Sequence, residues 1–553
     1  MSFKPIIYQV LPRIFGNKTS DLVPGSSFKT NGCGKLDDFT LETLDTIKDL
    51  GCTHIWFTGI LRHATKTAFP ECGLPANHSS IVKGEAGSPY SITDYYDVAP
   101  SIATNPANRI NEFEQLIARC KSLSIGVIID FVPNHLSREY KSVKRPEERE
   151  EFGAHDKIDY SFHPSNNFYY ILGSSFKSPA QSTDIKPYIE IPAKVTGNDC
   201  INPEPSDADW YETVKLNYGY DIFSGNKQSF FNPIPDTWNK MYDILDYWLC
   251  KGVSGFRCDM AEMVPLDFWE WVIPKTKENH KEVLFIAETY NPHSYSLFLE
   301  KSRFDYLYDK VGLYDTLKAI TRGEKECSEI SKCWHSLGLH ENNMLNFTEN
   351  HDEVRLASKY FATDPYKGLP ALVVSLLLNK SPYMLYFGQE LGEKGDYAEG
   401  FSKEDGKTSI FDYWSMESIR NWRRGEFDQK LRNIYKALLN LANTEKAFTE
   451  GEKYDLHYAN SKNPQYEGKE NFSFSRKHGN SFFIIHVSFN NPNKEIKLNL
   501  PNDMFQFFKL PKVNLCEMRD MLNGDIWKGQ LESDKTIHFG KCSNGIKIIK
   551  LSL

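Results

Sequence analysis

The chain has 553 residues, a formal net charge of −8 and an aromatic content of 14%, without an unusual share of Gly or Pro. This length predicts several domains, or one large barrel with attached parts. The ordinary composition excludes collagen-like and low-complexity chains. The negative charge is spread without long runs of one sign, so nothing supports binding to nucleic acid.

The eleven cysteines are scattered along the chain, odd in number, and form no Cys-x-x-Cys pair. This pattern argues against a disulfide scaffold or a zinc ribbon and favours buried thiols in a reducing compartment. No signal-peptide segment stands at the amino terminus, and the apolar stretch 369–378 is far shorter than the roughly 20 residues that span a bilayer. We therefore expect a cytoplasmic protein without a membrane partner. The sequence does not indicate an oligomeric state.

Short apolar segments rich in β-branched residues alternate with segments of helical periodicity. Predicted helices cover, for example, residues 111–123, 238–250 and 266–277. Eight alternating units of strand and helix predict an α/β fold, a TIM (β/α)8 barrel. The segments predicted as its parallel strands are 6–11, 54–58, 126–132, 253–259, 283–288, 304–308, 344–347 and 383–387.

Two segments depart from this alternation. About a hundred residues separate the third strand from the next helix, too many for a structureless loop inside a compact domain. Beyond residue 450, apolar and polar residues alternate as they do in antiparallel strands. The predicted domains are a first barrel part at 1–136, an inserted irregular subdomain after the third strand at 137–221, a second barrel part at 222–449, and a C-terminal antiparallel β-sandwich domain at 450–553.

Polar residues stand at the carboxyl ends of four predicted strands, which in a barrel open on one face. Any one of them alone fits a helix cap, a turn or a structural ion pair. Ionisable groups at the ends of buried strands are costly to desolvate unless they are paired, so their gathering on one face favours a catalytic site. They are Asp130, Asn134 and His135 after the third strand, Arg257 and Asp259 at the fourth, Glu288 at the fifth, and His351 and Asp352 after the seventh.

The carboxylates suggest a division of labour. Arg257 and Asp259 are two residues apart, so they point to the same side of the strand. The guanidinium is expected to keep Asp259 ionised, as a nucleophile must be. Glu288 is a neighbouring carboxyl with the partly apolar surroundings of a general acid. Retaining cleavage of a glycosidic bond requires such a pair, with the two carboxyl groups about 5–5.5 Å apart.

The same residues carry a resemblance. The segments 130–135, 255–259, Glu288 and 347–352 resemble, in order and spacing, the four short motifs of the α-amylase family of glycoside hydrolases. The segment 213–217 is similar to a further motif as it stands in the neopullulanase-like branch. The resemblance covers nearly the whole chain. It implies a TIM barrel that cleaves α-glucosidic bonds with retention.

By motif position, the resemblance makes Asp259 the nucleophile, Glu288 the acid/base and Asp352 the stabiliser of the transition state. The implied substrate-binding residues are Tyr90, as the platform under the sugar, and His135, Arg257 and His351. Glu262 departs from the family pattern after the nucleophile and is expected to contact the acceptor sugar. Asn134 matches the family's calcium-binding asparagine, so structural calcium is an expected cofactor, and no organic cofactor is implied.

The expected substrate and partner is an α-glucan oligosaccharide derived from starch, cleaved at α-1,4 and also α-1,6 bonds. A glucanotransferase remains an alternative, because it uses the same glycosyl-enzyme intermediate. A catalytically silent glucan-binding barrel would lack one of the three carboxylates, and all three are present. A metal-dependent amidohydrolase barrel would need His-x-His at a strand end, and none of the fifteen histidines forms this pattern.

Overall fold

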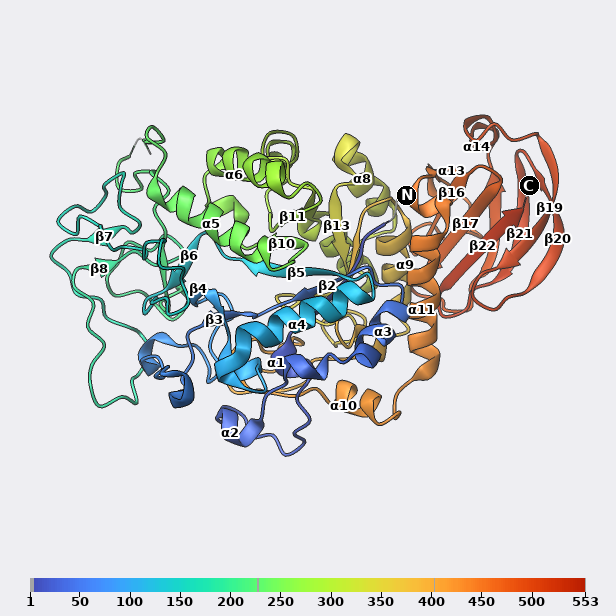
Figure 1. The fold of residues 1–553 in the computed structure, drawn as a ribbon. Helices are drawn as coiled ribbons and strands as arrows, with labels where there is room; N and C mark the ends of the chain where they lie inside the picture. The colour runs from blue at the N-terminus through green and yellow to red at the C-terminus, as the bar shows by residue number, and fades with distance from the viewer. Residues whose placement is uncertain (1–3, 226–227, 402, 553) are drawn as a thin grey trace.

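The structure is a computed structural model that describes residues 4–225, 228–401 and 403–552. Its centre is a closed barrel of eight parallel strands in the order β1-β14-β13-β12-β11-β10-β5-β2 (Figure 1). These are the eight predicted segments, each within two residues at its ends, so the predicted (β/α)8 barrel is confirmed. The strands are β1 (Ile6–Val10), β2 (His54–Phe57), β5 (Gly126–Phe131), β10 (Gly255–Cys258), β11 (Leu284–Ala287), β12 (Tyr306–Tyr308), β13 (Met344–Phe347) and β14 (Tyr383–Tyr386).

Helices surround the barrel, and the longer ones at its surface bury an apolar face. In α4, for example, Phe113, Leu116 and Cys120 recur at helical spacing and are buried. Helix α9 is buried along its whole length, because it lies between the barrel strand β13 and the C-terminal domain. The helices are α1 (Pro12–Phe15), α2 (Phe28–Asn31), α3 (Leu41–Asp49), α4 (Arg109–Ser122), α5 (Asp236–Cys250), α6 (Leu266–Asn279), α7 (Asp315–Thr321), α8 (Ser328–Leu337), α9 (Leu369–Leu377), α10 (Glu417–Arg423), α11 (Gln429–Thr444) and α12 (Lys446–Thr449).

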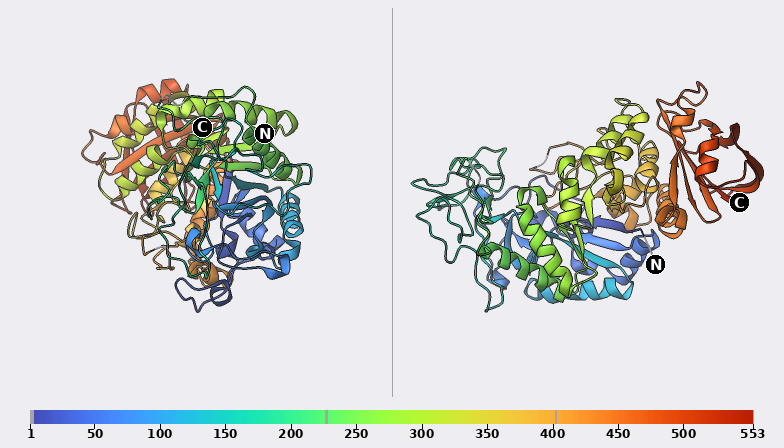
Figure 2. Two further views of the ribbon diagram at one scale, coloured as in Figure 1. Left: turned by 90° about the vertical axis from the view of Figure 1, so that its left-hand side faces the viewer. Right: turned by 90° about the horizontal axis from the view of Figure 1, so that it is seen from above.

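The long connection between β5 and α5 forms an irregular body at one end of the barrel (Figure 2). Among its described residues, the regular structure consists of short antiparallel pairs, in which β6 pairs with β9 and β7 with β8. A similar pair, β3 with β4, follows β2. Asp94 of β4 is fully buried and accepts hydrogen bonds from Ser142 and Val143 of the inserted segment. These pairs are β3 (Leu61–His63), β4 (Ile92–Val98), β6 (His135–Ser137), β7 (Tyr170–Ile171), β8 (Ala193–Lys194) and β9 (Thr213–Lys215).

The C-terminal segment is an antiparallel β domain, as predicted. A six-stranded sheet, β15-β16-β17-β22-β19-β20, and the pair β18-β21 enclose an apolar core that includes Phe482, Leu498 and Phe539. The strands are β15 (Glu452–Asp455), β16 (Asn471–His478), β17 (Ser481–Ser488), β18 (Glu495–Leu500), β19 (Val513–Asp520), β20 (Ile526–Glu532), β21 (Lys535–Lys541) and β22 (Ile546–Ser552), with the short helices α13 (His457–Asn460) and α14 (Asn502–Phe507).

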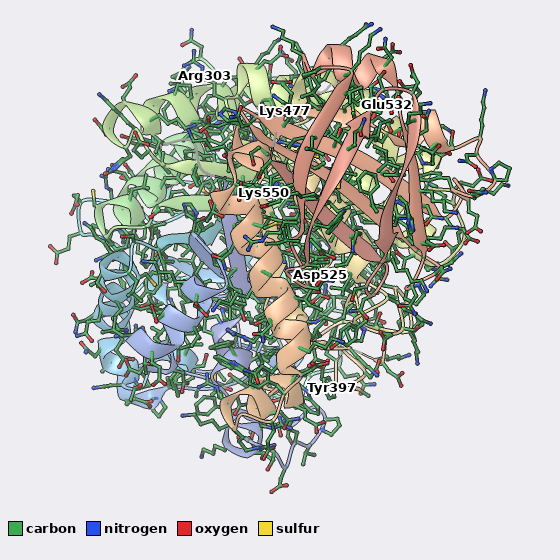
Figure 3. All side chains as sticks on the ribbon, turned by 90° about the vertical axis from the view of Figure 1, so that its right-hand side faces the viewer. Arg303, Tyr397, Lys477, Asp525, Glu532 and Lys550 are labelled. Atoms are coloured by element: carbon green, nitrogen blue, oxygen red, sulfur yellow. The ribbon has the colours of Figure 1, made fainter. Side chains whose placement is uncertain are left out.

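The C-terminal domain packs against the barrel at the end opposite the inserted segment (Figures 1 and 2). Lys550 of β22, labelled in Figure 3, contacts Glu445, the residue after α11, at 2.6 Å. Buried Arg476 of β16 donates to the backbone oxygens of Leu378 and Ala447. The contacts between the domains thus lie away from the inserted segment.

Among the described residues, no helix combines the length and the apolar character that a membrane crossing requires. The predicted bounds of the four domains stay predictions. The expectation that no leader is present rests partly on residues 1–3, which lie outside the described residues.

Candidate active site

The predicted polar residues gather at the carboxyl ends of the barrel strands. Arg257 lies within β10, and Asp259 follows the last residue of that strand. Glu288 directly follows β11, and Asp352 lies five residues beyond the end of β13. Because all eight strands are parallel, these ends meet on one face of the barrel. The inserted segment faces the same end, since β6 begins at His135, four residues after β5.

Arg257 joins the two carboxylates that were predicted to react. Its Nη1 atom is 2.6 Å from Oδ1 of Asp259, and its Nη2 atom is 2.8 Å from Oε2 of Glu288. A weaker contact of 3.5 Å links Nη1 to Oδ1 of Asp130. The guanidinium is 1% exposed, so water screens these interactions little. One buried cation therefore holds both carboxyl groups in fixed positions.

Burial sets the protonation of Asp259. It raises the pKa of the Asp259 carboxyl well above its usual value, Arg257 opposes this rise, and Glu288 adds to it. Arg257 thus favours the ionised form, as predicted, but burial outweighs it. A single guanidinium balances only one of the two negative charges that Asp259 and Glu288 can carry.

Glu288 is held by three hydrogen bonds. Its Oε2 atom accepts from Arg257 and, at 2.7 Å, from the backbone N–H of Met260. Its Oε1 atom accepts from the hydroxyl of Tyr290 at 2.6 Å. Because Oε2 already faces two N–H donors, Oε1 is the atom with room for a proton.

Asp352 and His351 form a second group on the same face. Oδ2 of Asp352 lies 3.0 Å from Nε2 of His351. Burial alone would raise the pKa of Asp352, but contact with His351 outweighs it and lowers the pKa to about 2. The other ring nitrogen of His351 is 2.7 Å from Nε2 of Gln9, and its ring stacks with Tyr90 at a centroid distance of 5.5 Å. Asp352 is therefore an anion of fixed orientation.

A cavity of about 290 Å³ opens among these groups. Asp259, Glu288 and Asp352 all line it, together with Tyr90 and His135. Other lining residues come from the inserted segment and from loops, among them Lys83, Trp210, Glu212, Tyr290, Ile410 and Phe411. The cavity is at the small end of the range for small-molecule sites, about 300–1,000 Å³.

The rings of Tyr90 and His135 form part of the cavity wall. The Tyr90 ring is buried, with the Arg257 guanidinium 5.3 Å from its centre. The His135 ring packs at 5.2 Å from Trp210 of the inserted segment. Burial, with Lys215 and Lys83 nearby, lowers the pKa of His135 to about 3. His135 is therefore neutral and hydrogen-bonds without charge.

The family model for the α-amylase catalytic domain matches residues 9–522. The chain belongs to the α-amylase family. It is 23% identical over 429 residues to α-amylase 3 of Dictyoglomus thermophilum, covering 74% of this chain and 69% of that one. It is 24% identical over 419 residues to glucan 1,6-α-glucosidase of Streptococcus pneumoniae, covering 70% and 65%. Amylases and α-glucosidases are among its relatives, and this member of the α-amylase family is a glycosidase.

Solved structures share the fold of this α-amylase family member. The α-amylase of Geobacillus thermoleovorans, complexed with acarbose, has a TM-score of 0.65 at 18% identity, covering 100% of this chain and 98% of that one. The noncanonic maltogenic α-amylase AmyB of Thermotoga neapolitana has a TM-score of 0.63 at 19% identity, covering 99% of each chain. At these identities the likeness is one of fold.

Glu262 does not lie with the other predicted site residues. Its carboxylate accepts from the backbone N–H groups of Tyr290 and Asn291, both at 2.9 Å, and from the hydroxyl of Ser294 at 2.8 Å. It lines a neighbouring cavity rather than the one among Asp259, Glu288 and Asp352. In the structure Glu262 orders the turn after Glu288. Its expected contact with the acceptor sugar stays a prediction.

Asn134 does not fit a calcium site. Its Oδ1 atom, the ligand that calcium would use, lies 2.5 Å from the ammonium of Lys215. That ammonium also contacts Oδ1 of Asp199 at 2.9 Å and the backbone oxygen of Met263 at 3.1 Å. These three oxygens are of the kinds that bind Ca²⁺, but the Lys215 ammonium already lies between them.

Three residues of the site were not predicted from the sequence. Tyr290 follows Glu288 by two residues, the same spacing that predicted the contact of Arg257 with Asp259, so this spacing could have indicated it. Gln9 is a polar residue within the apolar strand β1, which could also have indicated a place in the site. Trp210 belongs to the irregular inserted segment, where no periodicity pointed to it.

Proposed function

We propose that the protein is a retaining hydrolase of α-1,4 glucosidic bonds, and also of α-1,6 bonds, in oligosaccharides derived from starch. The observation that carries this proposal is the arrangement of Asp259 and Glu288 on two nitrogens of one buried guanidinium. Carboxyl groups held this close suit a nucleophile and an acid/base, whereas an inverting enzyme needs room for a water molecule between its carboxyls.

In the first step, the Asp259 carboxylate attacks the anomeric carbon while Glu288 donates its proton to the glycosidic oxygen. The bond between carbon and leaving oxygen breaks, the aglycone departs with the proton, and a glycosyl ester forms on Asp259. In the second step, Glu288 accepts a proton from water, whose oxygen attacks the anomeric carbon. The ester breaks, and both carboxyl groups return to their starting state.

The surrounding residues fit the positive charge that develops on the sugar. Asp352 is ionised over the accessible pH range, since its pKa is about 2, and it stabilises that charge. Tyr90 offers an aromatic face for the ring, neutral His135 offers a hydrogen bond to a hydroxyl group, and His351 holds the Asp352 carboxylate. A cavity of about 290 Å³ suits a single sugar ring at the point of cleavage.

The cellular location and the action on both linkages form part of the proposal. All eleven cysteines are free thiols, which supports the reducing environment of the cytoplasm. The names of the relatives include both an α-amylase and a glucan 1,6-α-glucosidase, which supports action on either linkage.

The deciding experiment is a time course of products from maltoheptaose, with pullulan in parallel, and with NMR detection of the anomer released first. Shorter oligosaccharides with new reducing ends and initial α-anomer support a retaining hydrolase. Initial β-anomer would overturn the assignment of Asp259 as nucleophile. Products longer than the substrate without new reducing ends would make the protein a transferase, and cleavage of pullulan would support the neopullulanase-like similarity.

A further inference from the structure

A buried lysine joins the inserted segment to the barrel. Lys215, the last residue of β9, is 6% exposed. Its ammonium contacts three oxygens of three chemical kinds: the amide oxygen of Asn134 at 2.5 Å, the carboxylate of Asp199 at 2.9 Å and the backbone oxygen of Met263 at 3.1 Å. An ammonium has three N–H donors, so each oxygen can be paired with one of them.

The three oxygens come from separate parts of the chain. Asn134 lies between β5 and β6, Asp199 belongs to the inserted segment, and Met263 follows the nucleophile by four residues. An amide, a carboxylate and a backbone carbonyl are oxygen ligands of the kind that Ca²⁺ takes in proteins. Here the single positive charge of Lys215 is balanced by the single carboxylate of Asp199.

We propose that the Lys215 ammonium acts as a built-in cation, which replaces a divalent ion at the junction of barrel and insert and positions two walls of the catalytic cavity. The ammonium occupies the space among the oxygens, so the wild-type protein needs no metal ion at this junction. Lys215 is a positioning residue, because it acts on the substrate only through its neighbours.

The first wall is His135. It directly follows Asn134, whose Nδ2 atom lies 3.1 Å from Nδ1 of His135 and donates to the backbone oxygen of Gly197 at 2.8 Å. Lys215 pairs with His135 across the two strands β9 and β6. Loss of the ammonium would free the amide of Asn134 and with it the ring of His135.

The second wall is the loop from Asp259 to Met263. Its first part donates the backbone N–H of Met260 to Glu288 at 2.7 Å, and its last part is tied to Lys215 through Met263. One ammonium therefore restrains both a sugar-binding residue and the loop that supports the acid/base. This positioning role rests on the proposed glycosidase function, whereas the replacement of a metal ion does not.

The test measures melting temperature and kinetics of Lys215→Ala and of the wild type, each with EDTA and with millimolar Ca²⁺. The wild-type melting temperature is expected to be the same in both solutions. Lys215→Ala leaves three oxygens around an empty space, so its melting temperature should fall in EDTA and rise again with Ca²⁺, by mass action. Its kcat/KM should fall about tenfold or more, since small displacements of positioned groups have effects of this size, and should recover in part with Ca²⁺.

Lys240→Ala is the matched control. Lys240 of α5 is also buried, and it contacts the carboxylate of Asp236, the backbone oxygen of Glu151 and the amide oxygen of Asn167. It has the same kinds of partners, but none of them adjoins a residue that lines the catalytic cavity, whereas Asn134 adjoins His135. Its variant should lose melting temperature while kcat/KM stays within about twofold of the wild type, as expected for a site away from the chemistry.

Two results would overturn the proposal. A wild-type melting temperature that falls in EDTA and is restored by Ca²⁺ would show that a divalent ion, not the lysine, holds the junction. A Lys215→Ala variant that loses only stability, with kcat/KM unchanged, would remove the positioning role. If Lys215→Ala does not fold, Lys215→Met removes the charge, keeps most of the side-chain volume and replaces it in the kinetic comparison, where a fall in kcat/KM is again expected. The wild-type melting experiment stands even if no glucan is cleaved.

Discussion

The Arg257 guanidinium and the Asp259 carboxylate lie on the same side of β10 and are joined by a contact of 2.6 Å. The two residues are separated only by Cys258, which is buried in the apolar core. Strand geometry alone therefore places the cation next to the carboxylate, since side chains two apart share a face. The same cation also reaches Glu288 from the neighbouring strand.

Replacing Asp259 by Asn should lower kcat by about 10³-fold or more, because an amide cannot form the glycosyl ester. The fold should persist, since Asn keeps the shape and can still pack beside Arg257. Turnover of maltoheptaose and circular dichroism check the two points. Asp243→Asn is the control. Asp243 lies on α5, and its replacement removes a 2.7 Å ion pair with Arg149, so the variant should remain active. Normal turnover by Asp259→Asn would refute its assignment as nucleophile.

The acid limb of the profile of kcat/KM against pH should lie at a higher pH than the usual pKa of an aspartate. The pKa of Asp259 is raised, so as the pH falls Asp259 becomes protonated sooner and the nucleophile is lost. Below that pKa, kcat/KM should fall about tenfold per pH unit. The profile of kcat/KM for the free enzyme measures this, with stability recorded at each pH. Full activity maintained down to about pH 4, the usual range of aspartate, would contradict the raised pKa.

Tyr290→Phe removes the only side-chain hydroxyl that contacts Oε1 of Glu288 among the described hydrogen bonds. The hydroxyl donates to Oε1 when Glu288 is ionised and can accept from it when Oε1 carries the proton, so it orients the acid/base in both steps. We expect kcat to fall about tenfold, the usual scale for a lost hydrogen bond to a charged group, with KM little changed. Steady-state kinetics separate the two constants. A rise in KM with constant kcat would instead assign Tyr290 to substrate binding.

Glu399→Gln should stabilise the protein at alkaline pH. Glu399 is fully buried, and burial raises its pKa to about 8 from 4.5. A carboxyl whose pKa is raised on folding destabilises the folded state progressively as the pH rises from the unfolded to the folded value. The gain from Gln should therefore be small near pH 4.5 and reach on the order of 4–5 kcal/mol at and above pH 8.

Melting temperatures of Glu399→Gln and wild type across this pH range test the prediction. Glu404→Gln is the control from the same loop, because Glu404 is 47% exposed and pairs with Lys359. An equal gain for Glu399→Gln at acidic and alkaline pH would exclude ionisation as the cause.

The strands could be predicted because parallel barrel strands are buried on both faces and read as continuous apolar runs. The contact of Arg257 with Asp259 could be predicted because it depends only on strand geometry. The surroundings of Asn134 could not, since its neighbour Lys215 is 81 residues away in the chain and reaches it through an irregular segment without periodicity. The position of Glu262 depends on how one turn folds after Glu288, which spacing does not encode.

The C-terminal β domain packs on the far end of the barrel from the inserted segment that helps to line the catalytic cavity (Figure 1). A surface, label or fused protein attached through this domain would therefore lie at the end of the molecule opposite the cavity. Immobilisation through the C-terminal domain should leave the entrance to the cavity facing solvent.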